Sequence, residues 1–127
     1  MSINSYSKEL LLGFYSLARN YYLCGFFDEA EHICSGIIAI DDKTTPVRLL
    51  NAAINLEQGN FSLAANHFRI ASQNPTYFNQ SRVGILNCYI CQKDSARAQS
   101  LAQELNKDMV SFEPELSAFF KEQLTLL

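Results

Sequence analysis

Apolar and small residues recur along this chain with a fixed step of 34 residues. The segment GFFDEA begins at Gly25, the similar segment GNFSLA begins at Gly59, and a weaker third copy, KDSARA, begins at Lys93. A sequence that repeats itself at such an interval predicts a structural unit that is copied along the chain. Two further columns of residues keep the same step: Ala18, Ala52 and Leu86 in one, and Tyr22, Leu56 and Ile90 in the other.

A period of about 34 residues is typical of tetratricopeptide (TPR) units, each of which is a pair of antiparallel helices. We therefore predict an all-α fold of three TPR helix-turn-helix repeats plus a C-terminal capping helix, in a single domain over residues 1–127. In the first repeat, helices are expected over 6–24 and 27–40. The predicted boundaries are about 8–41, 45–75 and 77–107 for the repeats and about 113–126 for the capping helix.

Residues with strong turn and capping preferences stand at the expected helix ends. Gly25 suits a left-handed cap after the first helix. Thr45-Pro46 is a suitable N-cap followed by proline in the first turn, and Pro75 is expected to end the second repeat. Asp94 or Ser95 is expected to cap the second helix of the third repeat.

Two departures from the pattern stand out. The second repeat has Asn51 and Asn55 where the first repeat is apolar, so either that helix is rotated or these amides are hydrogen-bonded in the concave surface. The third repeat has Lys93 and Ser95 in place of the glycine and the aromatic residue.

The last segment, SFEPELSAFFKEQLTLL, leaves the repeat. Ser111 or Glu113, standing before Pro114, indicates the start of a helix. An array of repeats needs its last apolar face covered, so a capping role is expected. Five residues of this helix fall near one face: Leu116, Phe119, Phe120, Gln123 and Leu124.

Composition and charge narrow the class of protein. Apolar residues make up 48% of the chain, which is enough for a packed core, and five Gly and three Pro fit a mostly helical protein. The net charge of −3 gives no basic footprint, so nucleic acid and membrane are not expected partners. The apolar run LLLGFYSLA has neither the flanks of a signal peptide nor the length of a membrane span, and a cytoplasmic location is expected.

The first helices of successive TPR units line the concave surface of the array. Such an apolar, partly aromatic surface is rarely left bare, and it suits an amphipathic helix with anchors at i, i+3, i+4 and i+7. The alternative is that the groove collapses or is filled by the C-terminal helix or a second copy. Binding of a peptide's C-terminal carboxylate is not expected, since that needs several Lys, Arg or Asn side chains. The concave face carries only Arg19 and Asn87. The predicted groove residues are Leu12, Tyr15, Arg19, Tyr22, Leu49, Ala53, Leu56, Val83, Asn87 and Ile90.

The pair Cys88-x-x-Cys91 is the one motif that suggests chemistry. A redox pair is favoured at a helix N-terminus, but this pair lies near the end of its predicted helix, where the dipole opposes a thiolate. Zinc needs two more ligands, and the other Cys and His residues lie on other helices. We therefore expect small apolar packing residues, no metal, no cofactor and no enzymatic activity.

Three features together resemble the TPR-type chaperones of type III secretion needle subunits in Gram-negative bacteria. They are the short three-repeat layout, the segment VRLLNAAINLEQGNFSLA from Val47, and the closing segment EPELSAFFKEQ from Glu113. The likeness covers most of the chain, and the closing segment is its more particular part.

The resemblance implies a mechanism and two partners. Chaperones of that family hold the amphipathic C-terminal helix of the needle subunit in the concave groove and so prevent premature polymerisation in the cytosol. They work as a trimer with a small helical co-chaperone. Two other functions remain open. One is a chaperone of translocator proteins, and the other is a general TPR interaction adaptor that forms a homodimer.

Overall fold

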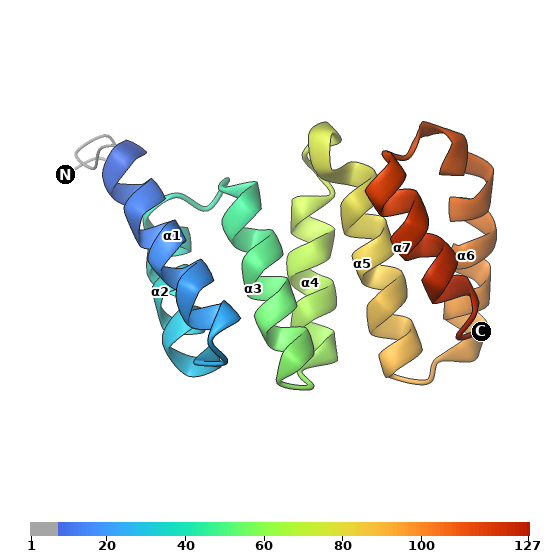
Figure 1. Cartoon of the computed structure of the whole chain (residues 1–127), viewed down its shortest axis with the longest axis horizontal. Helices are drawn as coiled ribbons and strands as arrows, with labels where there is room; N and C mark the ends of the chain where they lie inside the picture. Colours follow the sequence, from blue (N-terminus) through green and yellow to red (C-terminus); the bar gives the residue numbers. More distant parts are fainter. Residues whose placement is uncertain (1–7) are drawn as a thin grey trace.

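The computed structural model describes residues 8–127, and every regular element in that range is helical. Figure 1 shows the helices side by side along the long axis of the molecule, from α1 and α2 at one end to α6 and α7 at the other. The elements are α1 (Lys8–Leu23), α2 (Phe27–Ile40), α3 (Thr45–Glu57), α4 (Phe61–Ala71), η2 (Pro75–Tyr77), α5 (Phe78–Cys91), α6 (Ser95–Asp108), η3 (Met109–Ser111) and α7 (Pro114–Leu124).

The α-helices pack as sequential antiparallel pairs, α1 with α2, α3 with α4, and α5 with α6, and each pair also contacts the next. This arrangement is consistent with helix-turn-helix repeats and confirms the all-α prediction. The helix predicted over 27–40 has those bounds in the structure. The helix predicted over 6–24 ends at Leu23, and its expected start lies outside the described residues.

The turn inside each pair is closed by the same backbone hydrogen bonds. In each turn, the N–H two residues beyond the helix's C-cap donates to a carbonyl five residues earlier, which is the Schellman arrangement at a helix end. The 34-residue period is therefore a property of the backbone as well as of the side chains. The three bonds are Phe26 N–H to Tyr21 O (2.8 Å), Asn60 N–H to Asn55 O (2.8 Å) and Asp94 N–H to Tyr89 O (3.0 Å).

The centre of each turn is a residue with positive φ. Gly25 and Gly59 have φ of +84° and +78°, as the predicted left-handed cap requires. Lys93 has φ of +59° and occupies the equivalent place in the third turn. The third pair thus keeps the turn although it has lost the glycine, and its Lys93 takes a conformation that is uncommon for a residue with a Cβ atom.

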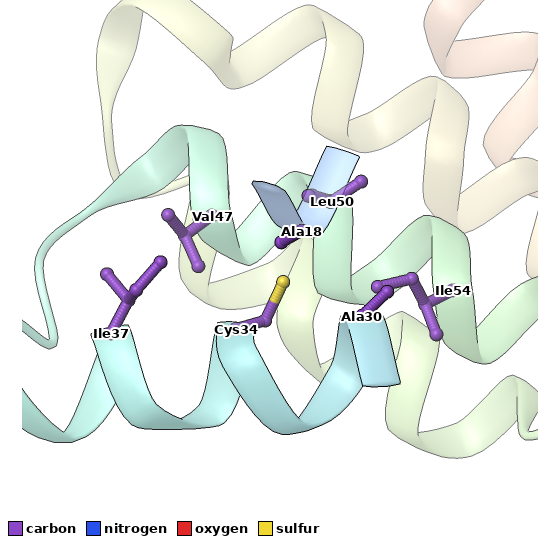
Figure 2. Packing of buried hydrophobic residues seen from close by; sticks show 7 residues of the cluster. All are labelled: Ala18, Ala30, Cys34, Ile37, Val47, Leu50 and Ile54. Atoms are coloured by element: carbon purple, nitrogen blue, oxygen red, sulfur yellow. The ribbon is translucent and has the colours of Figure 1, made fainter. Parts of the chain in front are cut away.

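The core is built from small and apolar side chains at equivalent positions of the three pairs. Figure 2 shows one cluster, where residues of α1, α2 and α3 converge. Small residues at these positions let the helices approach closely. Four columns at the 34-residue step are buried in all three pairs: Ala18, Ala52 and Leu86; Ala30, Ala64 and Ala98; Cys34, Phe68 and Ala102; and Ile37, Ala71 and Leu105.

Gly84 lies at a close approach between α4 and α5. A methyl group in place of its hydrogen would lie 2.6 Å from Cζ and 2.7 Å from Cδ1 of Phe68. Carbon atoms do not pack at such distances, so the ring of Phe68 occupies the space that any other residue would need. The second and third pairs are therefore joined by a contact that only glycine permits.

The C-terminal segment covers the last pair. Phe120 of α7 is fully buried with Leu86 and Leu105, and its ring lies edge-on to Phe112, with centroids 5.8 Å apart. Leu116 and Leu124 pack against the same cluster, as the predicted apolar face requires. Two further residues complete that face in the prediction: Gln123, which is buried, and Phe119, which keeps 40% of its surface exposed.

Several predicted helix ends differ in detail. Thr44, and not Thr45, is the N-cap of α3, and it makes no capping hydrogen bond with its side chain. The hydroxyl of Thr45 accepts instead from the amide of Asn74 at 3.1 Å, which ties the start of α3 to the end of the second pair. Helix α4 ends at Ala71, before Pro75, because residues 72–74 already turn the chain and Pro75 opens η2.

Two open choices about helix starts are resolved. Asp94 is the N-cap of α6, and its carboxylate accepts from the N–H of Arg97 at 3.3 Å. Glu113, and not Ser111, is the N-cap of α7, with Pro114 in the first turn as predicted.

Candidate partner-binding groove

A hollow of about 920 Å³ opens between the first helices of the pairs and the C-terminal segment. Helices α3 and α5 supply most of its lining, and the segment after α6 supplies most of the rest. Its volume is in the range of pockets that bind ligands in other proteins. The side chains from α1, α3, α4 and α5 that line it include Tyr22, Leu49, Ala53, Leu56, Glu57, Phe68, Asn79, Gln80, Val83, Asn87 and Cys91.

A second hollow of about 350 Å³ lies beside the first, between α1, α3 and the start of α5. The two hollows share Tyr22, Leu49 and Gln80 in their linings. Together they follow α1, α3 and α5 in turn, and we call them the groove. The smaller hollow adds Tyr15 and Arg19.

Eight of the ten predicted groove residues line one hollow or both: Tyr15, Arg19, Tyr22, Leu49, Ala53, Leu56, Val83 and Asn87. The other two lie elsewhere. Leu12 is 62% exposed and lines neither hollow. Ile90 packs against the cluster that α5 shares with α6 and α7, although it occupies the same repeat position as Tyr22 and Leu56. Tyr22 and Leu56 also pack partly against the clusters of their own pairs, but they line the groove as well.

The floor of the larger hollow is apolar and tightly packed. Val83 and Phe68 are buried, and the glycine at 84 brings the ring of Phe68 against α5. Leu49 and Leu56 are half-buried and present apolar surface to the opening. A ligand that covers this floor removes that apolar surface from water, at a gain of about 25 cal/mol for each Å².

Tyr22 stands where the two hollows meet. Its ring packs against Phe27, with centroids 5.8 Å apart. Burial, and then the negative charge of Glu57, raise the pKa of the Tyr22 hydroxyl. The hydroxyl therefore stays protonated at neutral pH and is able to donate a hydrogen bond at the centre of the groove.

The C-terminal segment, one expected alternative occupant of the groove, forms a wall of it and does not fill it. Leu116 and Phe119 of α7 and Phe112 before it line the larger hollow, and the hollow remains open beside them. Successive residues of a helix point about 100° apart, so Phe119 and Phe120 do not share one environment. Phe120 enters the core and Phe119 faces the groove, although the sequence predicts both near one face.

The charges of the larger hollow are all negative. Glu57, Glu113 and Glu115 line it, and no Lys, Arg or His does so. The nearby cation Arg82 is turned away, since its guanidinium pairs with Asp108 at 3.0 Å and lies 4.8 Å from the ring centroid of Phe78. The smaller hollow carries one charged residue, Arg19.

The two asparagines of α3 are hydrogen-bonded but do not line the groove. Asn51 and Asn55 are 3% and 1% exposed. The amide of Asn55 donates to the backbone carbonyl of Asn51 at 2.8 Å and to its side-chain oxygen at 3.1 Å. Of the two alternatives, the hydrogen bonding is therefore found, but not its expected place, since the amides are paired inside the protein and line neither hollow.

Cys34, Cys88 and Cys91 lie in surroundings that disfavour the thiolate. Burial is the main cause that raises the pKa of Cys88, and likewise of Cys34, to about 12. Burial also raises the pKa of Cys91, whose thiol donates to the side-chain oxygen of Asn87 at 3.7 Å. A reactive thiol needs the opposite shift. Within residues 8–127, no three His, Cys, Asp or Glu side chains gather closely enough to hold a metal ion.

Two further findings bear on the class of protein. In the described part of the chain, no helix has both the length and the apolar character that a membrane crossing requires. In comparisons with known proteins, no family model matches the chain, and no curated protein matches it. The fold and the groove are therefore the grounds for a functional proposal.

Proposed function

We propose that the chain is a TPR protein of three repeats, α1–α2, α3–α4 and α5–α6, with α7 as the capping helix, and that its groove binds an amphipathic helix of a partner protein. The observation that carries the proposal is the open apolar groove along α1, α3 and α5, the helices that line the concave surface in a TPR array. An α-helix with its side chains is about 10–12 Å wide and buries its apolar stripe through anchors one turn apart.

The more specific form of the proposal is a cytoplasmic chaperone of a type III secretion needle subunit. The resemblance of Val47–Ala64 and of the closing segment from Glu113 supports it, and so does the contribution of that closing segment to the groove. The groove covers the amphipathic C-terminal helix by which needle subunits polymerise. A small helical co-chaperone completes the complex, and no catalysis, cofactor or metal is involved.

A general TPR adaptor that forms homodimers is the second candidate. The exposed apolar residues on α1 favour it, since Phe14 and Leu17 are 40% and 44% exposed and lie one turn apart. Two measurable properties distinguish it from the chaperone. It self-associates, and it does not bind a polymerising client.

Charge placed in the groove tests the proposal. We expect Leu56→Glu and Tyr22→Glu each to weaken binding of the needle subunit at least tenfold, because the new carboxylate loses water against an apolar ligand face. In Tyr22→Glu it also meets Glu57. The measurement is co-purification with the tagged needle subunit encoded in the same gene cluster, with circular dichroism to check helicity.

The matched control is Leu63→Glu, on α4, which is 54% exposed and lines neither hollow. It is expected to co-purify as the unmodified chain does. Unchanged affinity in both groove variants would place the binding surface elsewhere on the molecule.

A further inference from the structure

The larger hollow combines an apolar floor with walls of one charge. Glu57, Glu113 and Glu115 line it, and no cation does. The apolar floor defines the binding surface, and the carboxylates decide which helices of suitable shape it accepts.

These carboxylates come from separate elements. Glu57 is the last residue of α3, whereas Glu113 is the N-cap of α7 and Glu115 lies in its first turn. Figure 1 shows that α3 ends at the lower edge of the array in that view and that α7 begins at its upper edge. The negative charges therefore belong to two opposite edges of the molecule, with the apolar floor between them.

The carboxylates are not neutralised by the protein itself. Within residues 8–127, the ion pairs join Arg82 to Glu104 and Asp108, and Arg97 to Asp94, and none of them includes a carboxylate of the hollow. The negative charge of Glu57 also acts inside the groove, since it is the second cause, after burial, that raises the pKa of the Tyr22 hydroxyl. An approaching helix meets this negative potential before it meets the apolar floor.

We infer that the partner helix is a cationic amphipathic helix, whose apolar stripe covers the floor and whose Lys or Arg residues flank the stripe and pair with Glu57 on one side and with Glu113 and Glu115 on the other. This inference rests on the proposed function, since it specifies the chemistry of the helix that the groove binds. Complementary charges of this kind raise the association rate and exclude acidic helices.

The size of the effect follows from the exposure of these carboxylates. An exposed ion pair changes an equilibrium by a factor of about five at most, because water and salt screen it. Three carboxylates that attract a cationic helix and repel an acidic one act together, so we expect a preference of about tenfold between helices that differ only in the sign of their flanking charges. The preference falls as salt is added, since the screening length shrinks from about 10 Å at 0.1 M to about 3 Å at 1 M.

The test uses two designed peptides of about 18 residues, or five helical turns. Both carry the same leucine stripe, flanked by lysine in one and by glutamate in the other, and a fluorescent label. Anisotropy titrations with the full chain at low salt should show about tenfold tighter binding of the lysine peptide. The preference should shrink to within about twofold at 1 M salt.

Two triple variants locate the effect. The variant with Glu57→Gln, Glu113→Gln and Glu115→Gln should bind both peptides with similar affinity. The control variant changes three carboxylates that line neither hollow, Glu29→Gln, Glu31→Gln and Glu122→Gln, and so has the same net charge. It should keep the preference of the unmodified chain.

Each failure has a distinct meaning. Equal binding of the two peptides at low salt, or equal loss of the preference in both triple variants, overturns the inference and leaves the groove as a helix-binding site. Binding of neither peptide overturns the proposed function, and the inference with it.

Discussion

The two ends of the helical array carry similar side chains in opposite surroundings. At the C-terminal end, Phe120 of α7 is fully buried in the cluster of α5 and α6. At the N-terminal end, Phe14 and Leu17 of α1 are 40% and 44% exposed, and within residues 8–127 no further helix covers them. The comparison shows that burial by a neighbouring element, and not apolar character, decides which residues stabilise the fold.

The sharpest test of this comparison is a pair of identical substitutions. We expect Phe120→Ala to lower the free energy of unfolding by about 3–5 kcal/mol, because it removes a buried ring and leaves a cavity. Phe14→Ala should change it by about 0.5 kcal/mol or less, as surface substitutions do. Urea unfolding followed by circular dichroism measures both. Equal losses in the two variants would show that the ends do not differ as described.

The second test changes the contact between the second and third helix pairs, where Gly84 of α5 meets Phe68 of α4. Gly84→Ala should destabilise the protein by about 1–3 kcal/mol, since the new methyl group and the ring of Phe68 need the same space. The control is Gly36→Ala in α2, where no heavy atom lies within 4 Å of an added Cβ atom. That change should stabilise the protein by about 0.5–1 kcal/mol, because alanine favours a helix interior. Effects of the same sign in both variants would contradict the close packing of α4 and α5.

The third test compares the turns of the N-terminal pairs with the turn of the last pair. Gly59→Ala should cost about 1 kcal/mol, since it places a Cβ atom at a positive φ. Lys93→Gly should stabilise the protein by about 0.5 kcal/mol, because it relieves the same strain in the third turn. Thermal unfolding monitored by calorimetry measures both shifts. A loss of stability in the Lys93 variant would mean that its side chain contributes more than the conformation costs.

The smallest effect is expected at the N-terminal end itself. The double variant Phe14→Lys and Leu17→Lys should leave the free energy of unfolding within about 0.5 kcal/mol of the unmodified chain. It should lower the fluorescence of a dye that binds exposed apolar surface. Leu63→Lys, at an isolated exposed position, is the control for the added charge. A large loss of stability in the double variant would show that these residues are packed.

The sequence predicted the repeated helix pairs because the period is set by features that the backbone requires. Gly25 and Gly59 stand where a positive φ is needed, and Ala30 and Ala64 stand where helices touch. The third turn could be predicted only from the 34-residue step, because lysine at position 93 does not by itself indicate a left-handed cap. For Asn51 and Asn55 the repeat left two alternatives open, because a polar residue in a repeat does not tell whether its partner is water or its own helix.

The groove was predicted for α1, α3 and α5 because these helices repeat one another. The repeat could not predict the wall formed by Leu116 and Phe119, which comes from a segment outside the period. Nor could it predict that Ile90 lines neither hollow, unlike Tyr22 and Leu56 at the equivalent positions. Side chains at the end of an array depend on what covers that end, and a period does not contain this information.

The central claim is that the groove holds the polymerising helix of a needle subunit. Size-exclusion chromatography with light scattering tests it most directly, on the chain alone and on the chain co-expressed with the needle subunit and the small helical protein encoded in the same gene cluster. The account predicts a soluble 1:1:1 complex in which the needle subunit stays unpolymerised. A monomer or dimer of this chain that elutes without either partner would contradict it and would favour a general TPR adaptor.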